Sequence, residues 1–188
     1  MNRESLLKVF EGLRKIDCTW AIGGSLMLSY FGLGVEPRDV DILIDAKDAK
    51  KIRGIMENIG KEISVPSKGN YRSKEFLKYN VDDVDFEFIG DYKIQWSNSE
   101  VYEFILDEKA IISGFIYGDI EVNFTTLEDW YVAYGVMSDP KERLPLLEEY
   151  FKVNGIQHRD LLERSLQQRL PDNIKNLIKE LIEDNDVI

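Results

Sequence analysis

The stretch WAIGGS at residues 20–25 is followed, after thirteen residues, by DVDILI at residues 39–44. The first predicts a short apolar strand, a Gly-Gly-Ser turn and the beginning of a helix, because glycine lets the backbone turn tightly. The second predicts a buried strand whose side chains alternate, so that Asp39 and Asp41 share one face. The short connection between the two segments returns the chain to an adjacent strand. The helix N-terminus and the acidic strand are therefore expected at one edge of a sheet.

Asp39 and Asp41 have the chemistry of a magnesium site. Their Cα atoms are expected about 6.5–7 Å apart. Their repulsion, roughly 2 kcal/mol at an effective dielectric constant of 20, is reversed by a divalent cation. Mg²⁺ takes oxygen ligands and keeps phosphate oxygens and water around it. The N–H groups of a helix N-terminus favour an anion, so Gly24 and Ser25 are candidates for holding a triphosphate beside the metal.

A second acidic strand is predicted at residues 84–88 (VDFEF), after an Asp82-Asp83 turn. Two-metal chemistry needs at least one carboxylate beyond the first pair. Asp85 is the preferred candidate, and Glu87 on the same face is the alternative. The exposed face of a surface strand shows the same alternation, and that structural interpretation stays open.

The rest of the sequence divides into an α/β part and a helical part. Helical spacing of apolar residues predicts helices at 4–15, 25–32 and 47–59, and period-two alternation predicts several strands between 61 and 124. After Thr126, which has capping-box spacing with Asp129, the pattern predicts four helices. We expect an α/β core at residues 1–125, with a C-terminal helical region at 126–188 packed on it.

Two groups of residues have a structural and a functional interpretation. A basic stretch contains Lys68, Arg72, Lys74 and Lys78. A solvated hairpin is preferred there over a contact with a triphosphate or an RNA end. The aromatic side chains at positions 92, 96 and 130 have two interpretations, stacking on a nucleotide base or packing in the core. Packing in the core is the preferred interpretation.

Composition excludes several classes of protein. The 188 residues carry 24 Lys and Arg against 35 Asp and Glu, a net charge of −11, which argues against broad binding of nucleic acid. The charge is compatible with a local nucleotide pocket or a cationic small substrate. A single histidine, His158, and a single cysteine, Cys18, argue against a His-based catalytic triad and a zinc site. The lone cysteine, the charged N-terminus and the lack of an apolar run near 20 residues favour a cytoplasmic protein without membrane association.

The acidic motifs resemble the signature of the polymerase-beta-like nucleotidyltransferase superfamily. The matching elements are Gly24-Ser25, then Asp39-Val40-Asp41 on a strand, then a third acid in Val84-Asp85-Phe86. The form Asp-x-Glu at 85–87 is similar to that of aminoglycoside and lincosamide nucleotidyltransferases. The segments at 128–130 and 140–143 are similar to the helix motifs of bacterial AbiEii-type relatives, which begin the second helix with a lysine and an acid. The resemblance covers residues 18–150.

This resemblance implies a nucleotidyltransferase fold, an α/β (α+β) arrangement with a mixed central sheet flanked by helices. It implies transfer of a nucleoside monophosphate from a nucleoside triphosphate, such as ATP, to a hydroxyl group, with release of pyrophosphate. Asp39, Asp41 and Asp85 would be catalytic and would bind two magnesium ions, with Glu87 as a further ligand. Gly24, Ser25 and Lys141 would hold the triphosphate. The sequence departs from many relatives at Pro37-Arg38, where they carry Ser or Thr; Arg38 pairs with Asp39 or reaches a phosphate, and the pairing is preferred.

The acceptor stays open. A hydroxyl-bearing small molecule of the aminoglycoside kind is the first expectation, and tRNA or a protein is the second, as for the toxin of a toxin–antitoxin pair. A non-catalytic nucleotide- or partner-binding module of the same fold is the rival from another class. The sequence does not determine whether the chain forms an oligomer.

Overall fold

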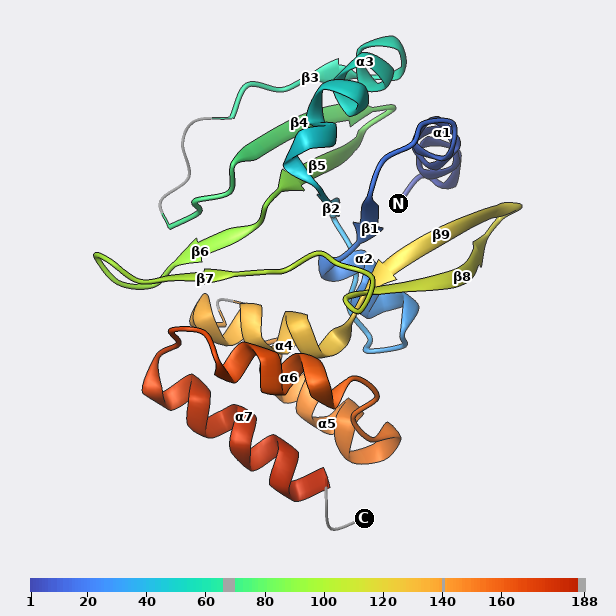
Figure 1. The fold of residues 1–188 in the computed structure, drawn as a ribbon. Helices are drawn as coiled ribbons and strands as arrows, with labels where there is room; N and C mark the ends of the chain where they lie inside the picture. The colour runs from blue at the N-terminus through green and yellow to red at the C-terminus, as the bar shows by residue number, and fades with distance from the viewer. Residues whose placement is uncertain (66–69, 140, 186–188) are drawn as a thin grey trace.

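A seven-stranded mixed sheet forms the centre of the computed structural model, which describes residues 1–65, 70–139 and 141–185 (Figure 1). The strands of this sheet are β1 (Trp20–Ile22), β2 (Asp39–Ile44), β3 (Lys61–Glu62), β4 (Glu75–Val81), β5 (Val84–Gly90), β8 (Ile111–Tyr117) and β9 (Ile120–Thr125). Their order is β3-β4-β5-β2-β1-β9-β8, and β6 (Lys93–Gln95) and β7 (Val101–Glu103) form a separate hairpin. The helices are α1 (Arg3–Arg14), α2 (Gly24–Tyr30), α3 (Ala49–Ile59), α4 (Leu127–Val136), α5 (Leu144–Asn154), α6 (Arg159–Leu166) and α7 (Asp172–Asn185).

The sheet lies between two layers of helices. Helices α1 and α3 lie on one side, and α4 to α7 lie together on the other (Figure 1). On the first side Phe10 of α1 stacks on Trp20 of β1, with ring centroids 5.9 Å apart. The predicted mixed sheet flanked by helices, with a helical C-terminal region, is confirmed.

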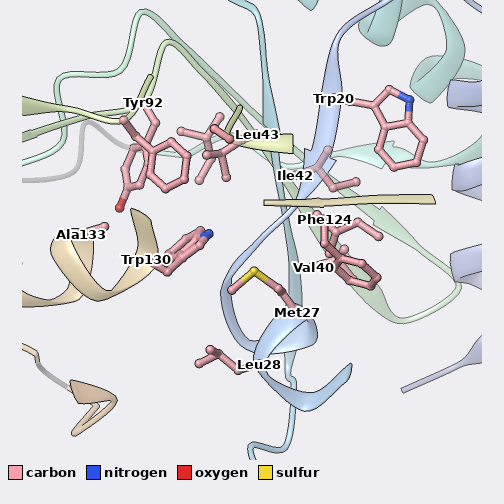
Figure 2. Close-up of a cluster of buried hydrophobic side chains, with 14 of the residues drawn as sticks. Trp20, Met27, Leu28, Val40, Ile42, Leu43, Tyr92, Phe124, Trp130 and Ala133 are labelled. Atoms are coloured by element: carbon pink, nitrogen blue, oxygen red, sulfur yellow. The ribbon is translucent and has the colours of Figure 1, made fainter. Parts of the chain in front are cut away.

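The strand pairing places β2 at the centre of the sheet. It is antiparallel to β1 and parallel to β5, with Asp39 beside Asp85 and Asp41 beside Glu87. The alternate residues Val40 and Ile42 are fully buried in the hydrophobic core, part of which is drawn in Figure 2. One face of this strand is therefore apolar throughout, and the other begins with two carboxylates.

A tight hairpin joins β4 to β5. Asp82 and Asp83, with φ of 48° and 68°, form its two-residue turn, which is the left-handed conformation that matches the twist of antiparallel strands. Val81 consequently lies opposite Val84, and every residue further along each strand has a defined partner.

Buried polar groups at the start of α4 cap this helix and bind it to the segment before α6. The hydroxyl of Thr126 accepts a hydrogen bond from the backbone N–H of Asp129 at 3.4 Å, so the predicted cap is confirmed. Glu128 is only 2 % exposed, and its Oε1 accepts the backbone N–H groups of Gln157 and His158, each at 2.9 Å. The last strand ends at Thr125 and α4 begins at Leu127, while the division into two units at 125/126 stays a prediction.

Several local expectations are wrong. The alternation of Ile63 and Val65 predicts a strand at these residues, whereas the structure has β3 at Lys61–Glu62. Helix α5 begins at Leu144, because the carboxylate of Asp139 accepts the N–H groups of Arg143 and Leu144 at 2.6 and 2.9 Å. Lys141 therefore lies in the preceding turn.

In the part of the chain that the structure describes, no helix combines the length and apolar character needed to cross a membrane.

Candidate active site

Side chains from three adjacent strands form a grid on the sheet face that looks toward α4. Because β4, β5 and β2 are paired in register, residues of equal height lie side by side across the strands. The two polar rows occupy one end of the grid and an apolar row follows them. The rows are Asn80–Asp85–Asp39, then Lys78–Glu87–Asp41, then Phe76–Ile89–Leu43.

A pocket with a cavity of about 200 Å³ opens over this grid. Its acidic lining consists of Asp39, Asp41 and Glu87. The opening of α2 contributes Ser25, and the segment before α5 contributes Lys141 and Arg143. Aromatic and apolar side chains complete the wall: Tyr71, Phe76, Ile89, Tyr92, Trp130, Tyr134 and Met137.

The Gly-Gly-Ser turn is pressed against the acidic strand. The N–H of Gly23 donates to the backbone oxygen of Asp41 at 2.9 Å. Gly24 has φ +56°, and a Cβ placed there would lie 2.8 Å from Cγ of Asp41. A Cβ on Gly23 would lie 2.7 Å from Cε2 of Trp130. Both glycines are therefore required by close packing, and Gly24 also by its backbone conformation.

Ser25 has the properties of a residue that lacks its ligand. Its side chain lines the pocket, the residue is only 8 % exposed, and its buried Oγ has no hydrogen-bond partner within the described residues. Buried polar atoms normally have a partner. The orphaned hydroxyl, next to a turn that has no room for a Cβ, fits a phosphate oxygen or a metal-bound group.

The two candidates for the third acid lie in different surroundings. Glu87 lies beside Asp41 and lines the pocket. Asp85, one row further out, is not among the lining residues; its Oδ1 accepts from Asn80 Nδ2 at 2.7 Å and its Oδ2 lies 3.0 Å from Lys78 Nζ. The bonds from Asn80 and Lys78 hold the pKa of Asp85 below its usual value against the effect of burial. Asp85 is the candidate preferred from the sequence, but the geometry favours Glu87 as the acid that faces the pocket.

Lys78 is not part of a solvated hairpin. Its side chain is 18 % exposed, and its Nζ lies 3.0 Å from both Asp85 Oδ2 and Glu87 Oε1. Burial opposes its charge, but these two carboxylates raise its pKa. The rest of the predicted basic stretch is different: Lys74 is mostly exposed, and Lys68 lies outside the described residues.

Four aromatic rings form one wall of the pocket. Tyr71, which is 42 % exposed, stacks on Tyr92 with ring centroids 6.1 Å apart. Tyr92 in turn contacts Trp130 at a centroid distance of 6.1 Å (Figure 2). Trp130 contacts Tyr134 at 5.2 Å, and its Nε1 donates to Thr125 Oγ1 at 2.7 Å. Tyr92 and Trp130 therefore belong to the core, as expected, and line the pocket as well.

Trp96 lies apart from this wall and donates its Nε1 to the backbone oxygen of Arg169 at 3.0 Å. Arg38 is exposed, and among the described ion pairs none joins it to Asp39. His158 lies at the start of α6 and is not among the residues that line the pocket.

Sequence reasoning missed six contributors to the pocket: Tyr71, Phe76, Ile89, Tyr134, Met137 and Arg143. It also misjudged Lys78, although a signal was present. A two-residue Asp82-Asp83 turn puts Asn80 opposite Asp85 and Lys78 opposite Glu87 by counting alone. No comparable signal exists for the aromatic wall, because it joins segments from distant parts of the sequence.

The acids have the oxygen chemistry that magnesium requires, with phosphate oxygens and water completing the ion's surroundings. As they stand, the described residues include no group of three or more His, Cys, Asp or Glu side chains that could hold a metal ion unaided. Asp39 and Asp41, on one strand face and beside the orphaned Ser25 hydroxyl, are the pair best placed for this role.

Comparisons with known structures identify the fold. The chain is similar to TM1012 of Thermotoga maritima, which is assigned as a nucleotidyltransferase, with 22 % identity, a TM-score of 0.59 and coverage of 80 % of this chain and 92 % of that one. The antibiotic-resistance factor ANT(2″)-Ia, in complex with adenylyl-2″-tobramycin, gives a TM-score of 0.59 at 11 % identity over 96 % and 97 % of the two chains. The lincosamide antibiotic adenylyltransferase LnuA, bound to lincomycin, gives 0.53 at 14 % identity over 79 % and 97 %.

A search of curated protein sequences gives no match. The family model for aminoglycoside-2″-adenylyltransferase matches residues 5–114, which include both acidic strands and the Gly-Gly-Ser turn. With its nucleotidyltransferase fold, its acidic grid and this match over more than half of its length, the chain belongs to the aminoglycoside-2″-adenylyltransferase family and is a nucleotidyltransferase.

Proposed function

We propose that this enzyme transfers the nucleoside monophosphate of ATP to a hydroxyl group of a small molecule and releases pyrophosphate, with magnesium as cofactor. One observation carries the proposal. Asp39, Asp41 and Glu87 reach the same pocket as the orphaned Ser25 hydroxyl. ATP is the donor we favour, because the matching family is described by adenylyl transfer.

The residues of the pocket divide into two functions. Asp39 and Asp41 would hold magnesium, which when bound offsets the negative charge of the triphosphate. Gly24 gives the phosphates close access to the backbone, and the hydroxyl of Ser25 donates a hydrogen bond to a phosphate oxygen. Lys141 supplies positive charge from the turn before α5. Catalysis of this kind depends on positioning and on charge stabilisation.

The reaction forms one bond and breaks one. The acceptor oxygen attacks the α-phosphorus of ATP, and the bond from that phosphorus to the bridging oxygen of the β-phosphate breaks. Pyrophosphate leaves with the electron pair, and the proton of the acceptor hydroxyl passes to a carboxylate. Glu87 is our candidate for this base because it lines the pocket, whereas Asp85 lies one row away and is not among the lining residues. Lys78 contacts both acids, but only Asp85 is also bonded by Asn80.

The acceptor is proposed to be a hydroxyl-bearing small molecule. ANT(2″)-Ia is known as a complex with adenylyl-2″-tobramycin and LnuA as a complex with lincomycin, so an antibiotic with a sugar hydroxyl is the first class to test. The aromatic wall of Tyr71, Tyr92 and Trp130 offers flat apolar contact to a ring of the donor or of the acceptor.

The test is pyrophosphate release from ATP and magnesium in the presence of tobramycin, lincomycin or water alone, with product mass measured in parallel. Asp41→Asn should abolish release. Asp119→Asn is the matched control, because Asp119 is an exposed residue of the β8–β9 turn, and it should leave release unchanged. Undiminished release in Asp41→Asn would remove Asp41 from the mechanism. Binding of ATP without turnover of any acceptor would favour the non-catalytic module instead.

A further inference from the structure

Lys78 lies where a cation is least expected if metal ions alone balance the acidic grid. Its Nζ is 3.0 Å from Glu87 Oε1 and 3.0 Å from Asp85 Oδ2, so one ammonium group bridges two of the four carboxylates. Asn80 completes the arrangement by donating to the other oxygen of Asp85 at 2.7 Å.

The fold builds this contact into the sheet. Lys78 on β4 is the direct cross-strand partner of Glu87 on β5, and the two-residue turn at Asp82-Asp83 allows no slippage of that register. A lysine at a sheet surface usually extends its ammonium group into water. Here the side chain is only 18 % exposed, and that of Glu87 is 10 % exposed. The bridge is therefore a largely buried contact that reaches the pocket through Glu87.

The charges of the grid separate into two halves. The half on β2 contains Asp39 and Asp41, beside the glycine turn and the orphaned Ser25 hydroxyl. The half on β5 contains Asp85 and Glu87, and its positive charge is already supplied by Lys78. A divalent ion bound to Glu87 would have to lie beside an ammonium group, and like charges in a partly buried site repel strongly.

We propose that Lys78 takes the place of a second metal ion in this enzyme. One divalent ion binds at Asp39 and Asp41, and the ammonium group of Lys78 holds Glu87 in position toward the acceptor hydroxyl. Lys78 is thus a positioning residue. This inference rests on the proposed function and replaces the expectation of two magnesium ions with one ion and one lysine.

The experiment counts bound ions and does not depend on turnover. Mn²⁺ replaces Mg²⁺ as a paramagnetic probe, and the free ion is measured by electron paramagnetic resonance in the presence of saturating α,β-methylene-ATP, which is not cleaved at the α-phosphorus. The wild-type chain should bind one Mn²⁺ tightly. Asp41→Asn, which removes a direct ligand, should weaken that binding by more than about 100-fold, because loss of an outer-shell partner alone typically costs about 10–100-fold. Glu87→Gln should leave both the number and the affinity within about threefold.

Variants of Lys78 test directly whether its ammonium group takes the place of a second metal ion. Lys78→Met removes the ammonium group that bridges Asp85 and Glu87 and should bind a second Mn²⁺, whereas Lys78→Arg should still bind one. Thermal unfolding reports whether each variant is folded. If Lys78→Met does not fold, the wild-type count and the Glu87→Gln affinity decide the question.

Two tight ions in the wild-type chain, or a loss of Mn²⁺ affinity in Glu87→Gln as large as in Asp41→Asn, would overturn the inference and leave the proposed function standing. A single ion in Lys78→Met would also overturn it. Failure of the wild-type chain to bind either the nucleotide analogue or Mn²⁺ would instead contradict the proposed function itself.

Discussion

Substitution of Gly24 by alanine separates the backbone requirement of the Gly-Gly-Ser turn from its requirement for space. Gly24 has φ +56°, and Gly34, in the α2–β2 connection, has φ +69°. Alanine in this left-handed region costs about 1–2 kcal/mol. Part of that cost is offset because alanine lowers the entropy of the unfolded chain by about 0.4–1 kcal/mol. The two variants should therefore share a backbone destabilisation of about 1 kcal/mol, or a fall of about 2–4 °C in the midpoint of thermal unfolding.

The two positions differ in what the new methyl group meets. At Gly34 nothing lies within 4 Å of the added Cβ, whereas at Gly24 it lies 2.8 Å from Cγ of Asp41. Carbon atoms in favourable contact are about 3.5–4.0 Å apart, so Asp41 must retreat by about 1 Å. A misplacement of that size in a catalytic group costs about 100-fold in rate, which corresponds to about 2.7 kcal/mol in the barrier.

The assays are thermal unfolding and steady-state pyrophosphate release, both measured on Gly24→Ala and Gly34→Ala. We expect similar unfolding midpoints, a loss of kcat/KM of about 100-fold in Gly24→Ala and a change of less than about threefold in Gly34→Ala. Equal activities in the two variants would refute the claim that Gly24 is needed to keep Asp41 in place.

Three further predictions concern the pocket rim and the helical region. Lys141→Ala should raise the KM for ATP by roughly fivefold, since a solvent-exposed charge contact contributes up to about 1 kcal/mol, and initial rates over a range of ATP concentrations measure it; an unchanged KM would exclude contact with the triphosphate. Glu128→Ala should destabilise the fold by about 2–4 kcal/mol in denaturant unfolding, because it leaves the part-buried N–H groups of Gln157 and His158 without their acceptor. A loss below about 0.5 kcal/mol would show that water replaces the carboxylate. Burial raises the pKa of Asp129 to about 6, above its value in an unfolded chain, so its protonated form stabilises the folded state below about pH 4 and this contribution is lost as pH rises through 6. Relative to Asp129→Asn, which stays uncharged, the wild-type chain should lose on the order of 2–3 kcal/mol between pH 4 and 7 in urea unfolding, and a constant difference would contradict the raised pKa.

Local patterns predict much of this molecule. The acidic strand, the turn before α2 and the cap of α4 all follow from neighbouring residues, because strand alternation, glycine geometry and helix capping act over a few positions. The register of Lys78 against Glu87 also follows from the Asp82-Asp83 turn, although the basic composition of the segment pointed to solvent. The beginning of α5 was misplaced because Asp139 caps it across a turn with left-handed residues, which helical periodicity does not reveal.

What the sequence determined by itself is the chemistry of the centre: Asp39 and Asp41 on one strand face, a glycine turn close by, and a further acid on a later strand. What only the tertiary structure decided is which of these groups share a pocket. Asp85 and Glu87 lie on the same strand face, so alternation cannot separate them, and their difference comes from their neighbours across β4 and β2 and from where α4 closes over the sheet. The aromatic wall likewise exists only because the fold brings Tyr71, Tyr92 and Trp130 together, since contact between distant segments depends on packing and not on sequence spacing.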